Sequence, residues 1–216
     1  MKKVLLFPFN GNAREAVSII NDINIFRQEW EIIGFIDDDP HKVNVQFGPF
    51  KVIGNREQIK DYPDSLLLAV PGRPENFLKR DAVIKSLGLP QERFATIIHP
   101  SVSVGYECTI GSNCLLMQNV VLTAGVTLGN DIVILPNTVI AHETSIGDYT
   151  LIGSNVTLSG SVKVGKQCYI GSGAKCLQEI TIGEKSLVGL GSVVIRDVPA
   201  GSVVVGNPAK IIRKIQ

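Results

Sequence analysis

The second half of the chain repeats an aliphatic residue at every sixth position. Stepping by six from Ile98 to Val194 gives 17 positions, of which sixteen are aliphatic and one, Cys176, is cysteine. The following position is glycine nine times, and the position two before is small or β-branched from Cys108 to Ser192. A β-strand alone has a period of two and a helix a period of 3.6. A period of six therefore indicates a chain that turns a corner every six residues.

Three short strands in each turn would build a triangular coil of 18 residues. The aliphatic side chains would point inward and stack on their copies in the next coil, at about the 4.8 Å spacing of paired strands. Small residues would fit beside them, and we expect the frequent glycine to supply backbone freedom at the corner. The repeat therefore predicts a hexapeptide parallel β-helix of just over five coils.

The first half has a different composition, since residues 1–97 hold 26 of the 41 charged residues. Its pattern alternates strand and helix. We expect strands at 3–9, 32–36, 65–70 and 94–98, a turn at 10–13, and helices at 14–25 and from the 71–74 segment to Leu87. Such alternation is typical of a small parallel sheet, which binds ligands at the carboxyl ends of its strands. Those ends carry Asn10, Gly11, Asn12, Asp37, Asp38 and Gly72.

Charge and apolar patterning exclude several classes of protein. The formal net charge is +1, so there is no electrostatic basis for non-specific nucleic-acid binding. No apolar run approaches the roughly 20 residues that span a bilayer. The first nine residues resemble a signal peptide, but Pro8 interrupts them and no small-residue cleavage site follows, so we expect a cytoplasmic protein. The four cysteines lack metal-ligand spacing, so we expect them in the core and expect no metal.

Histidine is the natural candidate for a general base, and the chain has three. We expect His41 in a solvated loop and His99 in a structural position. His142 should lie at an outward corner after Ile140, with Glu143 next to it, where a carboxylate can orient the ring. From the residues alone, a general base and an ordinary surface histidine remain equally open. A zinc site of the β-helical carbonic anhydrase type needs three converging histidines. His99 and His142 are not a whole number of 18-residue turns apart, so we do not expect such a zinc site.

The whole chain resembles the sugar O-acyltransferase family of sialic acid and bacillosamine biosynthesis, typified by the UDP-4-amino-sugar N-acetyltransferases. Three segments carry the resemblance: Ile97–Ser101 (IIHPS), Ala141–Gly147 (AHETSIG) and Val193–Lys210 with its closing VGNPAK. It implies an α/β Rossmann-like nucleotide-sugar domain over 1–94, a left-handed parallel β-helix over 95–195 and a C-terminal tail over 196–216. The fold class expected is thus Rossmann-like α/β followed by left-handed β-helix.

The resemblance also implies a chemistry. Acetyl-CoA would acetylate an amine on a nucleotide-linked sugar, with His142 as the base, Glu143 raising its basicity, and no metal. The sugar nucleotide, of a UDP-4-amino-4,6-dideoxy type, would lie on the six residues at the strand ends. The coenzyme would contact Gly160, Ser172 and Leu190, together with Leu151, where many relatives have a second histidine. The assembly would be a homotrimer with active sites between the β-helices of neighbouring chains. Acetylation of a hydroxyl on a sugar such as a sialic acid, and a non-catalytic trimeric scaffold, stay open as alternatives.

Overall fold

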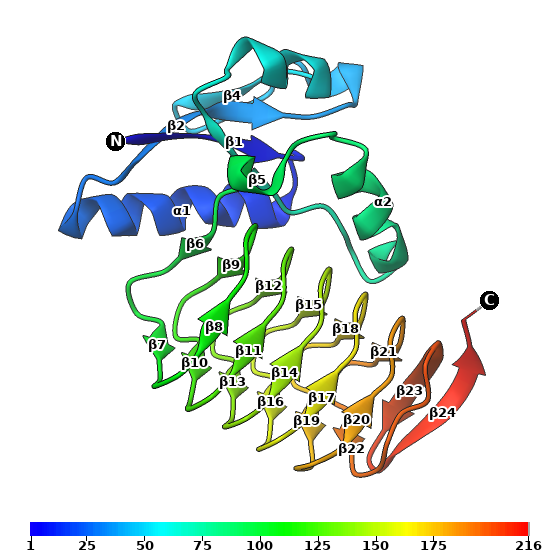
Figure 1. Cartoon of the computed structure of the whole chain (residues 1–216). Helices are drawn as coiled ribbons and strands as arrows, with labels where there is room; N and C mark the ends of the chain where they lie inside the picture. The colour runs from blue at the N-terminus through cyan, green and yellow to red at the C-terminus, as the bar shows by residue number, and fades with distance from the viewer. Residues whose placement is uncertain (216) are drawn as a thin grey trace.

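The computed structural model describes residues 1–215 and shows a small α/β domain stacked against a three-sided β-helix (Figure 1). This arrangement confirms the expected fold class, a Rossmann-like α/β domain followed by a left-handed parallel β-helix. The β-helix extends away from the α/β domain toward the C-terminus (Figure 1). The β-helix as a whole is called the coil below, and a position "one coil further on" lies one 18-residue turn along it.

The α/β domain is built on a sheet with the strand order β3-β4-β2-β1-β5. Its strands are β1 (Lys2–Phe7), β2 (Trp30–Ile36), β3 (Gln46–Phe47), β4 (Phe50–Gly54) and β5 (Leu66–Ala69). All neighbours are parallel except β3 and β4, which form a hairpin that the sequence pattern did not predict. The strand expected at 3–9 was too long, because β1 ends at Phe7. That earlier end leaves the following residues free to begin a helix.

Helix α1 (Gly11–Phe26) corrects the expected turn at 10–13. The side chain of Asn10 accepts a hydrogen bond from the Ala13 amide at 2.9 Å and caps the helix, which therefore begins at Gly11. One face of α1 is buried, and it carries Ala16, Ile19 and Ile23.

The second helix is also shorter than expected. Helix α2 covers only Arg80–Lys85, after the 3₁₀ turn η3 (Phe77–Lys79), and residues 71–74 form a loop. Gly72 has φ +121°, a conformation that no helix contains. The remaining 3₁₀ turns are η1 (Pro40–Lys42), η2 (Arg56–Asp61) and η4 (Gln91–Arg93).

The β-helix has three faces, each a sheet of two-residue parallel strands, and face 1 ends in a longer antiparallel pair. Face 1 holds β6 (Ile97–Ile98), β9 (Leu115–Leu116), β12 (Val133–Ile134), β15 (Leu151–Ile152), β18 (Tyr169–Ile170), β21 (Leu187–Val188) and then the pair β23 (Ser202–Gly206) and β24 (Ala209–Lys214). Face 2 holds β7 (Ser103–Val104), β10 (Val121–Leu122), β13 (Val139–Ile140), β16 (Thr157–Leu158), β19 (Lys175–Cys176) and β22 (Val193–Val194). Face 3 holds β8 (Thr109–Ile110), β11 (Thr127–Leu128), β14 (Ser145–Ile146), β17 (Lys163–Val164) and β20 (Thr181–Ile182). Partners such as Val121 and Val139 lie one 18-residue coil apart, as the repeat predicts.

The glycine that follows the inward aliphatic residue has a different role from the one expected. The left-handed backbone conformation occurs two positions later, for example at Glu107 (φ +58°) after Gly105 and at Asn155 (φ +56°) after Gly153. The earlier glycine is needed because the next coil is too close for a side chain. At Gly105, a Cβ would lie 2.1 Å from the carbonyl oxygen of Thr123. Close packing between coils, and not turning, selects glycine there.

Face 1 carries apolar side chains on its outer surface because the α/β domain covers it. Leu115, Val133 and Leu151 point outward from the coil and pack in one core with Val17 and Ile20 of α1. In Figure 1, α1 lies between the sheet and the first coils. This contact fixes the loops of the domain relative to face 1.

The chain after Arg196, expected as a separate tail, continues the coil. β23 pairs with β21 in parallel, and β24 returns antiparallel to β23. Cys114, Cys168 and Cys176 are buried and Cys108 is partly buried, in line with their expected place in the core. Over residues 1–215, no helix is both long and apolar enough to cross a membrane.

Candidate active site

The loop after β1 is held to the end of β5 by the side chain of Asn10. Its Oδ1 caps α1, and its Nδ2 donates to the carbonyl of Val70 at 2.9 Å. The first amides of α1, at Gly11 and Asn12, therefore lie beside the loop that begins after β5. An exposed helix N-terminus of this kind favours an anionic ligand.

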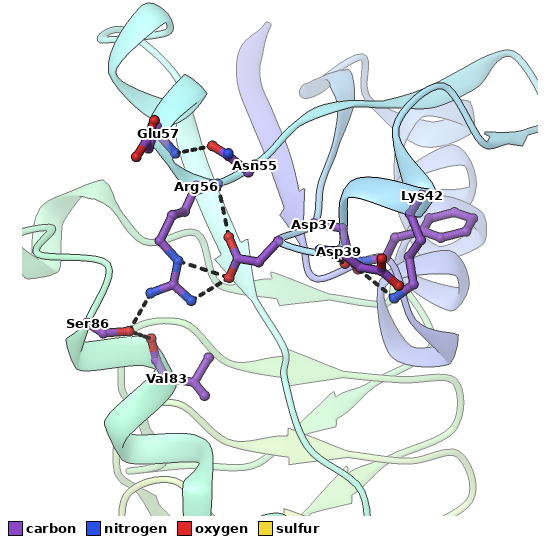
Figure 2. A network of polar contacts seen from close by, with 10 residues as sticks. Asp37, Asp39, Lys42, Asn55, Arg56, Glu57, Val83 and Ser86 are labelled. Carbon is purple, nitrogen blue, oxygen red and sulfur yellow. Dashed lines mark hydrogen bonds and ion pairs between the residues drawn. The ribbon is translucent and has the colours of Figure 1, made fainter.

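Asp37 and Asp38, the first two of the three acidic residues after β2, are engaged within the domain, and Figure 2 shows Asp37 beside Lys42. Asp37 is 4% exposed and accepts hydrogen bonds from the amide of Phe9 at 2.9 Å and from Lys42 Nζ at 3.0 Å. Asp38 accepts from Arg56 Nε at 2.9 Å, and Arg56 also donates to Ser86 Oγ at 2.6 Å. Hydrogen bonds from Arg56 hold the pKa of Asp38 below its usual range. Asp37 thus shapes the loop after β1, and Asp38 links β2 to the end of α2.

Two cavities meet at these loops. The sheet-edge cavity, of about 310 Å³, lies at the carboxyl ends of the strands, and its lining includes Asn10, Asp37, Asp38, Lys42, Arg56 and Arg73. The interdomain cavity, of about 260 Å³, is lined by Asn10, Gly11, Asn12 and Gly72 of the domain and by Val133, Leu135, Leu151 and Tyr169 of face 1. All six strand-end residues expected to bind a ligand line one or both cavities.

The shared wall of the two cavities is the loop at 71–73. Gly72 and Arg73 line both. A Cβ at Gly72 would lie 2.8 Å from Cγ of Arg80 and 3.2 Å from Cδ1 of Leu151, so this glycine is packed between α2 and the coil. Both the space and the positive φ require glycine here.

His142 lies at the turn between β13 and β14, with its side chain 63% exposed. Its ring rests against Gly160, the residue one coil further on. A Cβ at Gly160 would be 2.4 Å from Cε1 of the imidazole. The absence of a side chain at Gly160 therefore lets the imidazole lie against the coil while its edge faces solvent.

Glu143 stands beside His142, with Oε2 at 3.8 Å from the imidazole Nδ1. Ser161, one coil further on, donates its hydroxyl to that same oxygen at 3.0 Å. The left-handed backbone of Glu143 turns the chain and sets both side chains on the outer surface. The arrangement supplies an accessible imidazole with an adjacent, hydrogen-bonded carboxylate.

The two parts of the candidate site lie apart within one chain. The interdomain cavity is on face 1, whereas His142 lies at the edge between faces 2 and 3, which is the opposite edge of a triangular coil. Neither cavity is lined by His142 or Glu143. Within one chain, therefore, a ligand in these cavities does not lie against His142.

The residues expected along the coenzyme lie at three places on the coil. Gly160 lies against His142, and Leu151 lines the interdomain cavity on face 1. Ser172 and Leu190 stack at the edge between faces 1 and 2, where Ser172 Oγ accepts from the Ser154 amide at 3.1 Å and Leu190 is 74% exposed. The structure thus gathers Ser172 with Leu190 and Gly160 with His142, while Leu151 lies with the strand-end loops.

The other two histidines have local roles. His99 Nε2 lies 3.0 Å from Asp22 of α1, and its Nδ1 accepts from the Ser101 amide, so His99 joins the domain to the coil. His41 is exposed in η1. Residues 1–215 contain no group of three or more His, Cys, Asp or Glu side chains placed to hold a metal ion.

Comparison with known proteins supports the fold. The family model for the bacterial transferase hexapeptide (six repeats) matches residues 107–142, 125–160 and 143–178. PerB from Caulobacter crescentus, solved in complex with CoA and GDP-perosamine, is 25% identical over 99% of this chain and 98% of its own, with a TM-score of 0.83. This chain is an acyltransferase whose residues 107–178 carry the bacterial transferase hexapeptide repeat.

Two further structures share the fold. The acetyltransferase domain of PglB from Neisseria gonorrhoeae FA1090, in complex with acetyl coenzyme A, is 23% identical over 98% of this acyltransferase and 99% of the domain, with a TM-score of 0.83. WeeI from Acinetobacter baumannii AYE is 22% identical over 98% of this chain and 100% of its own, with a TM-score of 0.82. A search of the curated proteins found no match.

Sequence reasoning missed several residues of this site. Ser161 could have been found, because the 18-residue repeat places it next to Glu143. Arg56 and Arg80 could not, because their partners lie 9 to 51 residues away and no sequence period relates the pairs.

Proposed function

We propose that this acyltransferase moves the acetyl group of acetyl-CoA to an amino group on a nucleotide-linked sugar. The observation that carries the proposal is the likeness to PerB over 99% of the chain, which includes both the cavity loops and the His142 turn. PerB was solved with CoA and GDP-perosamine, so we take a nucleotide 4-amino sugar as the acceptor class.

The cavities suit such an acceptor. In the sheet-edge cavity, Arg73 and the ion-paired Lys42 and Arg56 supply positive charge for a diphosphate. The first amides of α1, at Gly11 and Asn12, supply N–H donors from the adjoining interdomain cavity. In the interdomain cavity, Leu135, Leu151 and Tyr169 supply an apolar wall for the sugar. We place the nucleotide in the first cavity and the sugar toward the second.

His142 would act as the general base. As the sugar amine attacks the thioester carbonyl, a C–N bond forms, the C–S bond breaks, and the imidazole takes the proton that the amine gives up. The proton then passes to the sulfur of the leaving coenzyme, which gives the amide and free thiol. Glu143 would stabilise the imidazolium formed in between. No metal and no acyl-enzyme enter this scheme.

We further propose a homotrimer in which His142 of one chain meets the cavities of another. The support is geometric, since one chain holds the imidazole and the cavities at opposite sides of its coil. The coenzyme would run along the coil past Gly160, Ser172 and Leu190.

A substrate panel tests the proposal. The purified protein is incubated with acetyl-CoA and with GDP- and UDP-linked 4-amino sugars, their 4-hydroxy counterparts and free sialic acid, and the products are analysed by mass spectrometry. We expect acetylation of a nucleotide amino sugar and none of its hydroxyl counterpart. Acetylation of free sialic acid alone would favour the O-acetyltransferase alternative, and no transfer to any acceptor would contradict the proposal.

A further inference from the structure

Arg80, the first residue of α2, is a charged side chain buried almost completely, at 1% exposure. Burial lowers its pKa to about 10, so the guanidinium stays protonated at neutral pH. Its Nε has no hydrogen-bond partner among the described residues 1–215. Burial of a cation with an unsatisfied donor costs stability, and an apolar side chain would fill the same space without that cost. Stability alone therefore does not account for arginine at this position.

The two terminal nitrogens of Arg80 join the two halves of the molecule. Nη1 donates to the carbonyl of Pro71, in the loop shared by the two cavities. Nη2 donates to the carbonyl of Asp131 in the coil at 2.6 Å. The same guanidinium thus holds a loop of the α/β domain against the β-helix.

The aliphatic part of Arg80 forms the back of the same loop. A Cβ at Gly72 would lie 2.8 Å from Cγ and 2.9 Å from Cδ of Arg80, so the loop backbone lies directly on this side chain. Leu151 closes on Gly72 from the coil. Gly72 and Arg73 then present their other sides to both cavities.

The coil also holds the strand that leads into the loop. Asn113 accepts from the amide of Ala69 at 2.8 Å and donates to the carbonyl of Ala69 at 2.9 Å, as a neighbouring strand would. The same Nδ2 donates to Asp131 Oδ1 at 2.7 Å. The end of β5 and the loop after it are therefore tied to one patch of the coil, made of Asn113 and Asp131.

We propose that Arg80 is a positioning residue for the acceptor, which holds residues 71–73 at the distance from the coil that sets the width of both cavities. The inference rests on the proposed function for the identity of the acceptor. Arg80 itself touches no substrate. Its effect passes through the backbone of Gly72 and Arg73.

Arg93 provides a matched control. It also donates to two main-chain carbonyls, those of Ser65 at 3.0 Å and Tyr62 at 3.1 Å, but it lines neither cavity. Arg93→Lys thus removes the same kind of contact from the same domain without changing the cavity loop.

The test compares wild type, Arg80→Lys, Arg80→Met and Arg93→Lys by amide hydrogen exchange over residues 70–76, by calorimetric titration with GDP and UDP, and by steady-state kinetics. Arg80→Lys keeps the charge and one donor, so it decides the outcome if Arg80→Met does not fold. We expect faster exchange over 70–76 and an acceptor KM raised about tenfold in Arg80→Lys, as for loss of one charged hydrogen bond. The acetyl-CoA KM should stay within about twofold of wild type, and Arg93→Lys should change none of these.

Unchanged exchange and acceptor KM in Arg80→Lys would overturn the inference, and so would parallel losses in acceptor KM, acetyl-CoA KM and thermal stability. If the wild type transfers no acetyl group, the proposed function fails but the positioning role is still tested. In that case, weaker GDP or UDP binding together with faster exchange over residues 70–76 in Arg80→Lys would support the positioning role. Unchanged nucleotide binding in that case would overturn it.

Discussion

The imidazole of His142 lies directly on the backbone of Gly160, one coil further along, where a Cβ would be 2.4 Å from Cε1 and 2.5 Å from Nε2. Gly160→Ala should therefore push the ring off its position. Because a displacement of about 1 Å can cost up to about 100-fold in rate, we expect kcat to fall by roughly 10- to 100-fold. The melting temperature should change little, since the ring is mostly exposed. Ser159→Ala is the control, and equal kcat in both variants would show that the ring position does not matter.

Glu143 faces the imidazole at 3.8 Å and is held by the hydroxyl of Ser161. Glu143→Gln removes the negative charge next to the imidazolium that forms during transfer. For two charges about 4 Å apart in water the loss is about fivefold in kcat. Ser161→Ala keeps the carboxylate but removes the hydrogen bond that holds it, so the loss in kcat should be smaller. A larger loss in Ser161→Ala than in Glu143→Gln would contradict this order.

The pairing of Asp38 with Arg56 predicts a pH-dependent contribution to stability. The hydrogen bonds hold the pKa of Asp38 below its unfolded value of about 3.9, so the contribution is fully present above that value and is lost as the pH falls through the folded pKa. At pH 7, Asp38→Asn should lower the melting temperature by roughly 1–4 °C, as expected for loss of a partly exposed ion pair. Below the folded pKa of Asp38, the variant and the wild type should melt at the same temperature. Thermal unfolding at several pH values measures this. The exposed Asp64→Asn variant is the control, and an Asp38→Asn difference that persists at the lowest pH would refute the assignment.

The separation of His142 from the cavities predicts that the site is shared between chains. Gly11 opens into the interdomain cavity, with nothing within 4 Å of a Cβ there, so Gly11→Trp should fill the cavity without disturbing the fold. Alone, Gly11→Trp should be inactive, and His142→Ala should keep at most about a hundredth of the wild-type rate. Mixed and reassembled, they should regain activity, because one chain offers an intact imidazole and the other an intact cavity. Light scattering should give the mass of a trimer. A monomer mass, or a mixture of the two variants without recovered activity, would place the site within one chain.

The repeat in the sequence predicted most of the coil, since an inward residue every six positions leaves one arrangement that buries them all. It also predicted the outward position of His142. The role of glycine was misjudged because the sequence shows where glycine occurs and does not show how near the next coil lies. At Gly105 that distance, and not φ, decides.

The α/β domain was predicted less well, because its decisive contacts are long-range and irregular. The Asn10 side chain that caps α1 is held by the carbonyl of Val70, 60 residues away. The loop at 71–73 depends on the contact between Arg80 and Asp131, which are 51 residues apart. The pattern at 71–87 is helical in composition, yet packing of Gly72 between α2 and Leu151 keeps the first part of that segment a loop. The acidic residues at 37 and 38 were expected to face a ligand, and the structure shows that both are also held by bonds inside the domain.

The kcat of His142→Ala tests the account most directly, with acetyl-CoA and the amino sugar that the wild type acetylates. Proton transfer by a positioned base contributes about 10²- to 10⁴-fold, so kcat should fall by that factor while both KM values stay near those of wild type. The imidazole is exposed at the surface of the coil, so the variant should fold and assemble as wild type does. A His142→Ala protein that keeps more than about half of the wild-type kcat, a smaller loss than any general base would give, would contradict the account.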